Sequence, residues 1–195
     1  GTGIGLVRLN TDGTFDATFD ADGMATFAPF AITPNGLAVL SSGLVLVAGH
    51  GGGGPNTDQI LARFTAAGAI DGTFGAGGTV VQSILALDDT VNDMIVQADG
   101  KIVLAGSSNN GVDTDLCVAR YTAAGALDTT FNATGSYLLT GTANEGANRI
   151  RQMTDGRLVA VGTTVRTDQD VLAIRLNTDG VLDTGFSPGG RWILD

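Results

Sequence analysis

The stretches LARFTAAGAIDGTF (61–74) and VARYTAAGALDTTF (118–131) match along their whole length, and they decide the fold. Two further copies, LVRLNTDGTFDATF (6–19) and AIRLNTDGVLDTGF (173–186), align with them without gaps. A second block follows each of the first three copies: GLAVLSSGLVLVAG (36–49), DMIVQADGKIVLAG (93–106) and RIRQMTDGRLVAVG (149–162). The chain is therefore a tandem repeat of about 55 residues, a period typical of solenoids and propellers.

Each repeat has the pattern of four short strands. In one copy, Met94–Val96 is apolar, Asp99-Gly100 predicts a tight hairpin turn, and 101–106 is the second strand. Residues 116–121 and 135–139 supply the third and fourth strands. No long window keeps a helical period without a glycine or a turn cluster. The sequence predicts an all-β fold of β-propeller-type repeats, each with four antiparallel strands. A parallel β-helix is the alternative, although its coils are usually shorter.

The repeat also predicts where each strand lies in its blade, with the strand nearest the propeller axis first. We expect three complete blades, over residues 31–84, 85–140 and 141–195, after an N-terminal half-blade over 1–30. All belong to a single repeat domain, which we expect to be part of a larger ring or array. The expected innermost strands are 36–41, 91–97 and 147–153, followed outward by 43–49, 101–107 and 157–163, then 58–65, 114–122 and 170–177, and last 77–83, 134–140 and 189–194. The half-blade contributes strands at 3–10 and 22–28.

Composition narrows the class of protein and of partner. The 195 residues include 30 glycines and are 43% hydrophobic but only 15% charged, which favours many short strands joined by tight turns. The net charge is −10 and Lys101 is the only lysine, so a nucleic-acid partner is not expected. No apolar run approaches 18 residues, so no membrane insertion is expected. The lone Cys117 lies in an apolar run and is expected to be a small buried hydrophobe.

Four segments carry a resemblance to a known family: ADGKIVLAG (98–106), VARYTAAGALDTTF (118–131), RLNTDGVLDTGF (175–186) and the trailing GAGG (75–78). They resemble the bacterial delta-60 repeat family, and the match covers nearly the whole chain. The first copy diverges most, because PNGLAVLSSGLVLVAG (34–49) has serine where an Asp-Gly turn is expected. The resemblance implies a β-propeller-like fold in large secreted or cell-surface proteins of bacteria. It implies no activity.

Three residue types recur at fixed places in every copy and are expected to build the blade. The repeated aspartates are expected to accept backbone N–H bonds in a tight loop, and the repeated phenylalanines to fill the space between blades. We expect the arginines to pair with an aspartate five residues upstream. The aspartates are Asp16, Asp71, Asp128 and Asp183; the phenylalanines are Phe19, Phe74, Phe131 and Phe186; the arginines are Arg8, Arg63, Arg120 and Arg175, with Asp58, Asp115 and Asp170 as partners of the last three.

The loops on one face differ in every copy, and this face is the candidate binding surface. They are 28–34, 50–56, 85–92, 107–112, 141–148 and 163–168. We expect them to offer polar side chains to a protein or carbohydrate ligand: His50, Asn56, Asp88, Asp89, Asn92, Asn109, Asn110, Asn144, Glu145 and Arg166.

The sequence favours a non-catalytic binding or adhesion module of a secreted or cell-surface bacterial protein. The alternative is a structural spacer without a ligand. In either role, we also expect the chain to contact the rest of a larger propeller or further copies of itself. An enzyme is not expected, because His50 lies in what reads as a flexible loop and no G-x-S-x-G motif occurs. No cofactor is expected. Weak calcium binding is compatible with Asp16, Asp20 and Asp22, although the glycine and glutamate of an EF-hand are missing. Asp88, Asp89 and Asp93 form an acidic cluster, expected to be solvated or to contact a cation or sugar.

Overall fold

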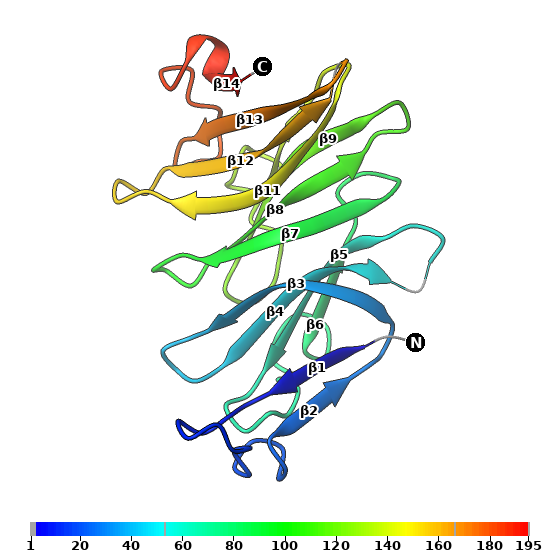
Figure 1. The fold of residues 1–195 in the computed structure, drawn as a ribbon, viewed down its shortest axis with the longest axis vertical. Coiled ribbons are helices and arrows are strands. Elements are labelled where there is room, and N and C mark those ends of the chain that lie inside the picture. The colour runs from blue at the N-terminus through cyan, green and yellow to red at the C-terminus, as the bar shows by residue number, and fades with distance from the viewer. Residues whose placement is uncertain (1–2, 53, 166, 195) are drawn as a thin grey trace.

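The computed structural model describes residues 3–52, 54–165 and 167–194, and their strands form four separate antiparallel sheets. Figure 1 shows the sheets stacked along the long axis, with the N-terminal pair at one end and the C-terminal sheet at the other. The N-terminal sheet holds β1 (Ile4–Val7) and β2 (Met24–Phe27) only. Three four-stranded sheets follow, in which neighbours in sequence are neighbours in space. The predicted all-β, propeller-type architecture is confirmed.

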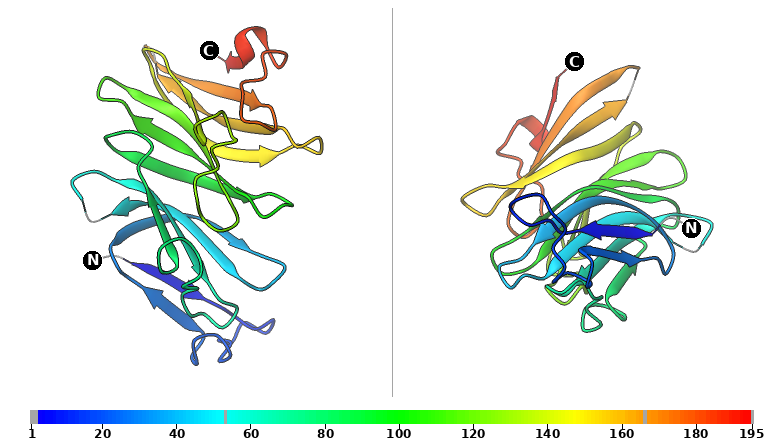
Figure 2. Two further views of the ribbon diagram at one scale, coloured as in Figure 1. Left: turned by 180° about the vertical axis from the view of Figure 1, so that it is seen from behind. Right: turned by 60° about the horizontal axis from the view of Figure 1, so that its bottom comes forward.

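The three full blades repeat one strand order. Blade 2 holds β3 (Ala31–Val39), β4 (Val45–Gly52), β5 (Asp58–Phe64) and β6 (Thr79–Gln82). Blade 3 holds β7 (Asp89–Val96), β8 (Ile102–Asn109), β9 (Thr114–Tyr121) and β10 (Ser136–Leu139). Blade 4 holds β11 (Asn144–Gln152), β12 (Leu158–Val165), β13 (Gln169–Leu176) and β14 (Arg191–Leu194), with a 3-10 turn, η1 (Pro188–Gly190), before β14. The half-blade of β1 and β2 is called blade 1, and Figure 2 shows the stack from two further sides.

The first two strands of each full blade are joined by a turn that needs a glycine. Gly100 has φ of 83°, a backbone conformation that side chains with a Cβ disfavour. The Asp99 carboxylate accepts a hydrogen bond from the Lys101 amide at 3.1 Å and closes the turn. Gly43 takes the same conformation, with φ of 82°, although serine precedes it. The divergent first copy therefore keeps the hairpin.

The innermost strands begin earlier than the sequence predicts. Each contains a β-bulge, where Asn35, Asn92 and Asn148 have no partner in the neighbouring strand and pairing resumes one residue later. A bulge shifts the alternation of the strand by one residue, so the segment before it does not follow the period seen after it. Residues expected to be loop are therefore paired backbone in the structure.

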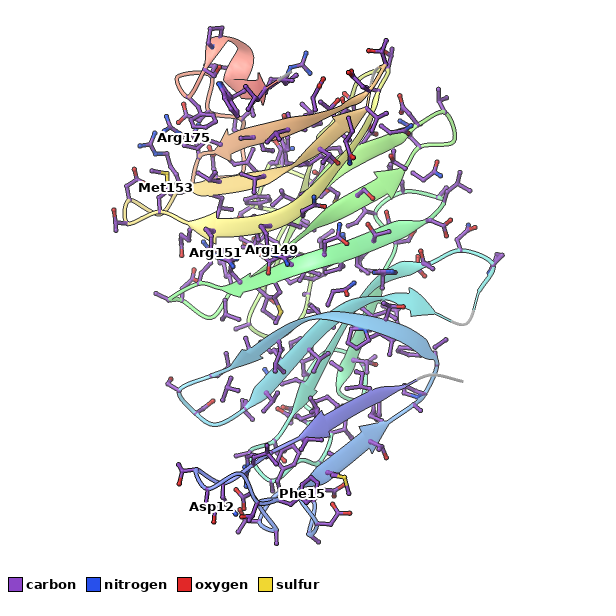
Figure 3. All side chains as sticks on the ribbon, viewed as in Figure 1. Asp12, Phe15, Arg149, Arg151, Met153 and Arg175 are labelled. Carbon is purple, nitrogen blue, oxygen red and sulfur yellow. The ribbon has the colours of Figure 1, made fainter. Side chains whose placement is uncertain are left out.

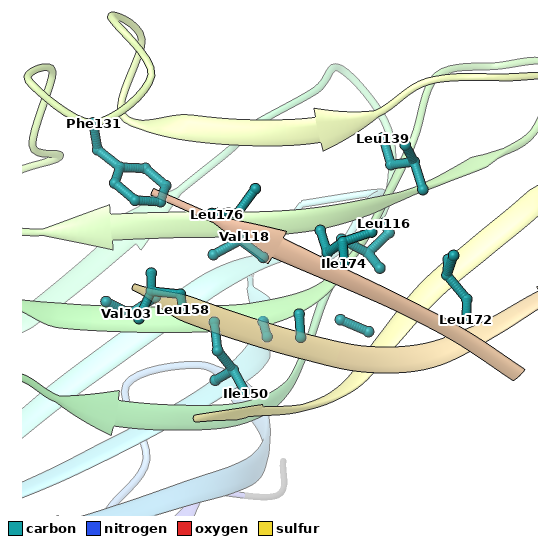
Figure 4. Packing of buried hydrophobic residues seen from close by; sticks show 13 residues of the cluster. Val103, Leu116, Val118, Phe131, Leu139, Ile150, Leu158, Leu172, Ile174 and Leu176 are labelled. Atoms are coloured by element: carbon teal, nitrogen blue, oxygen red, sulfur yellow. The ribbon is translucent and has the colours of Figure 1, made fainter. Parts of the chain in front are cut away.

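Apolar side chains fill the space between successive sheets. Alternation along each strand points one set of residues at the preceding blade and the other at the following blade. Blades 3 and 4 enclose the cluster in Figure 4, where Val103, Val118 and Phe131 meet Ile150, Leu158 and Ile174. Similar clusters lie between blades 2 and 3 and between blades 1 and 2. The fold is therefore a series of blade-to-blade interfaces and has no single central core.

Candidate functional site: blade-to-blade contacts and the loop face

The repeated arginine is the centre of a contact that links each blade to the next. In blade 2, Arg63 Nε donates to Asp71 Oδ2 at 2.8 Å, and its guanidinium lies 4.6 Å from the centre of the Phe74 ring. Arg63 Nη1 donates to the carbonyl of Ala123 in blade 3 at 3.0 Å. One side chain thus makes an ion pair, a cation–π contact and a bond to the next blade.

The same contact recurs at the other two interfaces. Arg120 Nη1 donates to the carbonyl of Thr178 at 2.8 Å, and Arg8 Nη1 donates to that of Ala66. A backbone bond runs beside each contact; for example, the Asn132 amide donates to the Asp179 carbonyl at 2.6 Å. All these acceptors lie in the turn between the third strand of the next blade and its repeated aspartate.

The predicted arginine partners are wrong. Arg8, Arg63, Arg120 and Arg175 pair with the aspartates eight residues downstream, at 2.7 to 2.8 Å, and not with Asp58, Asp115 or Asp170. An odd separation of five within a strand puts two side chains on opposite faces of the sheet. The arginines face the following blade, whereas the upstream aspartates face the preceding one.

The repeated aspartate organises its loop as predicted. Asp128 Oδ1 accepts bonds from the amide and hydroxyl of Thr130, while Oδ2 accepts from Arg120. Burial alone would raise the pKa of Asp128, but hydrogen bonds from Thr130 and Lys101 outweigh burial and hold that pKa far below its ordinary value. The carboxylate is therefore ionised at neutral pH and works as a structural acceptor.

The repeated phenylalanine packs on a glycine of the next blade. Phe131 is completely buried, and its ring lies 2.6 Å from where a Cβ on Gly180 would be. Gly180 also has φ of 86°, so only glycine suits both the turn and the ring. Phe74 lies against Gly125 and Phe19 against Gly68 in the same way. The predicted role of these rings is confirmed at these three interfaces.

The bulge asparagines form a further link that the sequence analysis missed. Asn35 Nδ2 donates to the carbonyl of Val91 at 2.8 Å, and Asn92 Nδ2 donates to that of Ala147 at 2.9 Å. Asn148 occupies the same place in blade 4 and is exposed. The signal was available, because an asparagine recurs at this position in all three inner strands.

Half of the ten candidate ligand-binding residues bond to a neighbouring blade, and two of these, Asp88 and Asn144, are also exposed to solvent. Asp88 Oδ1 accepts from the Thr57 amide at 2.8 Å, and Asn144 Oδ1 accepts from the Thr114 amide at 3.0 Å. Asn56 Nδ2 donates to the carbonyl of Ala86 at 2.9 Å. His50 Nδ1 lies 3.3 Å from both the amide nitrogen and the carbonyl oxygen of Val91.

The expectation that the candidate residues lie in loops is partly wrong. Six of the candidate residues lie inside strands: His50, Asp89, Asn92, Asn109, Asn144 and Glu145. Asn109 and Asn110 brace their own turn, since their side-chain oxygens accept from the amides of Gly111 and Val112 at 2.8 Å. Arg166 lies outside the described residues.

The acidic cluster expected to be solvated is also part of the interfaces. Asp89 is fully buried, and Asp93 Oδ2 accepts from the Ile150 amide at 3.0 Å and from Arg151 Nη1 at 2.6 Å. Asp88 accepts a hydrogen bond from the Thr57 amide, as described above. Asp88 and Asp93 of this cluster therefore form hydrogen bonds between blades.

Blade 3 contains a buried polar row that crosses its three inner strands. Asp89 pairs across the sheet with Ser108, and Ser108 with Asp115, so the three side chains share the face toward blade 2. All three are at least 99% buried. Asp89 Oδ1, Ser108 Oγ and Asp115 Oδ1 have no hydrogen-bond partner in the described part of the chain.

Burial changes the acid–base properties of this row. It raises the pKa of Asp89, and it also raises that of Glu145, the equivalent residue of blade 4. Cys117 lies next to the row and is fully buried as predicted, and burial raises the pKa of its thiol to about 12. A neutral buried thiol is a poor nucleophile, which fits the expected role of Cys117 as a small buried hydrophobe.

The calcium candidates do not converge on a shared point. Asp16 accepts from Arg8 and Thr18, and Asp22 Oδ1 accepts from the Met24 amide at 2.8 Å. In residues 3–52, 54–165 and 167–194, no group of three or more His, Cys, Asp or Glu side chains could hold a metal ion. The described residues also include no helix that is long and apolar enough to cross a membrane.

One shallow pocket opens on the loop face. It has a volume of about 260 Å³ and is lined by Thr33, His50, Pro55, Asn56 and Thr57 with nearby backbone. Two of these residues, His50 and Asn56, are among the predicted ligand contacts. The others come from the same blade, so the pocket does not gather loops from several blades.

Comparison with known proteins identifies the repeat. Residues 1–19, 40–74, 97–131 and 154–186 match a family described as a domain of unknown function (DUF5122) beta-propeller. The chain belongs to this family. Each of the last three DUF5122 matches runs from the hairpin turn to the repeated phenylalanine, which are the parts that build the interfaces above.

A crystal structure of a protein from Lactobacillus plantarum is 17% identical, with a TM-score of 0.46, over 93% of this chain and 51% of that one. The chain thus spans about half the length of that protein. No curated protein matches the sequence significantly.

Proposed function

We propose that this chain is a non-catalytic scaffold, in which repeated polar contacts join blades into a rigid array. The observation that carries the proposal is that polar side chains of the variable loops form hydrogen bonds to neighbouring blades. Asp88, Asn92 and Asn144 each bond to a neighbouring blade, so part of the hydrogen-bonding capacity of each side chain is already used within the fold. This favours the spacer role over the binding role that the sequence alone favours.

The proposal includes the narrower assignments that the sequence suggests. The chain would be of the delta-60 type, from a large secreted or cell-surface bacterial protein. Neither a cofactor nor a nucleic-acid partner is part of the proposal. The acidic balance, with a net charge of −10, supports a soluble exposed array that repels other polyanions.

A second candidate, ligand binding at the loop face, is favoured by the pocket at His50 and Asn56. A glycan array and a panel of immobilised extracellular proteins separate the two functions. A scaffold gives no saturable binding tighter than about 10 μM. Saturable binding that Pro55→Trp abolishes and Val112→Trp preserves would assign binding to the pocket, because Pro55 lines it and Val112 is an exposed loop residue elsewhere.

A further inference from the structure

In each blade the arginine and the phenylalanine reach toward the following blade, and we call this pair the outgoing half of the contact. The last blade carries such a pair, Arg175 and Phe186. Arg175 Nε donates to Asp183 at 2.7 Å and its guanidinium lies 4.8 Å from the Phe186 ring centre, as in the other blades. Among the described residues, nothing accepts a bond from Nη1 of Arg175, the atom that elsewhere reaches the next blade. Phe186 is only half-buried, whereas its three counterparts are fully covered.

The turn after the third strand receives the arginine and the phenylalanine of the preceding blade, and we call this turn the incoming half of the contact. The first blade carries such a turn. The segment RLNTDG (8–13) is identical to RLNTDG (175–180), whose turn receives Arg120 and Phe131. The two turns also share their conformation, since Gly13 and Gly180 both have φ of 86°. A Cβ on Gly180 would touch the Phe131 ring, but a Cβ on Gly13 would meet nothing within 4 Å. The turn at 10–13 is thus a complete and open receptor for the contact.

Both ends also expose apolar side chains that the inner blades bury. On blade 1, Val7 is 59% and Leu9 54% exposed, whereas their equivalents in blade 3, Ala119 and Tyr121, are fully buried. On blade 4, Val171 is 48% exposed and its equivalent Leu116 is fully buried. Exposed apolar faces of this kind mark interaction surfaces. Figure 3 shows Asp12 of the open turn at one end of the stack and Arg175 at the opposite end.

We propose that this chain binds a second copy of itself head to tail. The turn at residues 10–13 of one copy receives Arg175 and Phe186 of the other, and Val7 and Leu9 cover the apolar face around Val171. The occupant is identified by the three internal interfaces, which use the same contact, and by the identity of the two RLNTDG segments. Such a contact joins different surfaces of the two copies, so it continues the stack from one molecule into the next.

The proposal extends the scaffold function to a second copy. Its test reads association between copies, whereas the test of the scaffold function reads binding of other molecules. Either proposal can therefore fail while the other holds. The net charge of −10 opposes association, so measurements belong at 0.15 M salt, where screening acts beyond about 8 Å.

Sedimentation velocity of the 195-residue chain, between about 1 and 100 μM, tests the proposal. We expect the mean mass to rise with concentration. Val7→Glu at the incoming end and Val171→Glu at the outgoing end should each weaken association by at least about tenfold, because each would bury an unpaired charge. Both valines are exposed in the single chain, so the fold should survive, as checked by circular dichroism. Val112→Glu is the matched control, since Val112 is 93% exposed and lies between β8 and β9 of blade 3, which takes no part in the proposed contact.

Mixing the two variants tests the head-to-tail arrangement. A Val7→Glu copy keeps its outgoing end and a Val171→Glu copy keeps its incoming end, so an equal mixture should form a heterodimer that grows no further. A same-face dimer would not be restored by mixing. A cysteine pair, Asp12→Cys in one copy and Ser187→Cys in the other, should cross-link the heterodimer, because the equivalent residues 179 and 132 share a backbone hydrogen bond.

Three outcomes would overturn the proposal. The first is a parent chain that stays monomeric up to about 100 μM, which excludes association at any useful strength. The second is a mixture of the two variants that remains monomeric. The third is a Val112→Glu control that weakens association as much as the end variants do, which would trace the loss to added charge in general.

Discussion

At the scale of single residues, the repeated phenylalanine is the most consequential side chain. Phe131→Ala should lower the free energy of unfolding by about 3–5 kcal/mol, the usual range for removing a fully buried phenylalanine. Phe186→Ala is the matched control, because the same motif carries it but it is only half-buried; we expect a loss of about 1 kcal/mol. Urea unfolding measures both. Equal losses would show that the rings do not act by filling the space between blades.

The buried carboxyls give a residue-scale prediction about pH. Burial raises the pKa of Asp89, so the folded state holds its proton more tightly than the unfolded chain does. Proton binding by Asp89 therefore stabilises the folded state. This stabilisation is complete below about pH 4 and is lost as pH rises through the pKa of Asp89 in the folded state. The Asp89→Asn variant has no carboxyl at this position and does not lose this stability as pH rises. The free energy of unfolding of the variant, relative to that of the parent, should therefore increase between about pH 4 and pH 7.

Asp128 is the opposite case and serves as control. Its pKa is lowered, so it contributes stability that is complete above the ordinary pKa of an aspartate and is lost progressively as pH falls from there through the lower pKa of the folded state. Asp128→Asn should therefore destabilise most at pH 7 and least in acid. Urea unfolding between about pH 2 and pH 7 separates the two variants, because the effect of Asp89→Asn changes above about pH 4 and that of Asp128→Asn below it. A stability difference between Asp89→Asn and the parent that does not change with pH would contradict the assignment.

At the scale of elements, the two identical turns allow a matched experiment on one glycine position. Gly13→Ala costs about 1–2 kcal/mol, because an alanine at φ of 86° is strained and nothing else is displaced. Gly180→Ala meets the same strain and also pushes into the Phe131 ring, which adds about 1–3 kcal/mol. Thermal unfolding at low protein concentration compares them. A cost at Gly13 that matches or exceeds the cost at Gly180 would mean that the turn and ring do not pack as described.

The elements also show what the sequence can and cannot predict. The hairpin at Asp99-Gly100 and the strand expected at 114–122 follow from local turn chemistry and alternation, and both are found, the strand as Thr114–Tyr121. The start of β7 was missed, because the bulge at Asn92 breaks the alternation that marks a strand. The partner of Arg120 was missed for a related reason. Two aspartates flank Arg63, Arg120 and Arg175, and only the sheet geometry tells which of them shares the face of the arginine.

The candidate site was harder to predict than the fold, and the cause lies in the contacts between blades. Asp88 and Asn144 are polar, lie in the segments that vary most and would suit a ligand. In the structure each accepts a hydrogen bond from the backbone of the preceding blade. A side chain that bonds a neighbouring blade and one that bonds a ligand look alike in a single sequence, because both are polar and follow strands.

At the scale of the whole molecule, stability should vary along the stack, because each blade contacts only its neighbours. Blade 3 is covered on both sides, and Ile102–Ala105 and Leu116–Ala119 are completely buried. In the part of the chain that the structure describes, blade 1 has two strands and one covered face. At low concentration, amides of β1 and β2 should exchange with solvent at least about 100-fold faster than those of β8 and β9. Hydrogen–deuterium exchange with mass spectrometry resolves these segments.

Substituting the linking arginines tests whether the gradient comes from the interfaces. Arg8→Ala removes the bonds to Asp16 and to the Ala66 carbonyl, so it should speed exchange in β1 and β2 and leave β11–β13 unchanged. Arg120→Ala removes the equivalent bonds between blades 3 and 4, so it should speed exchange in both of those blades. Exchange that rises uniformly along the chain in both variants would mean that the stack unfolds as one unit. In that case the contacts between blades would couple all four sheets, and the exposed face of blade 1 would not make it the weakest part.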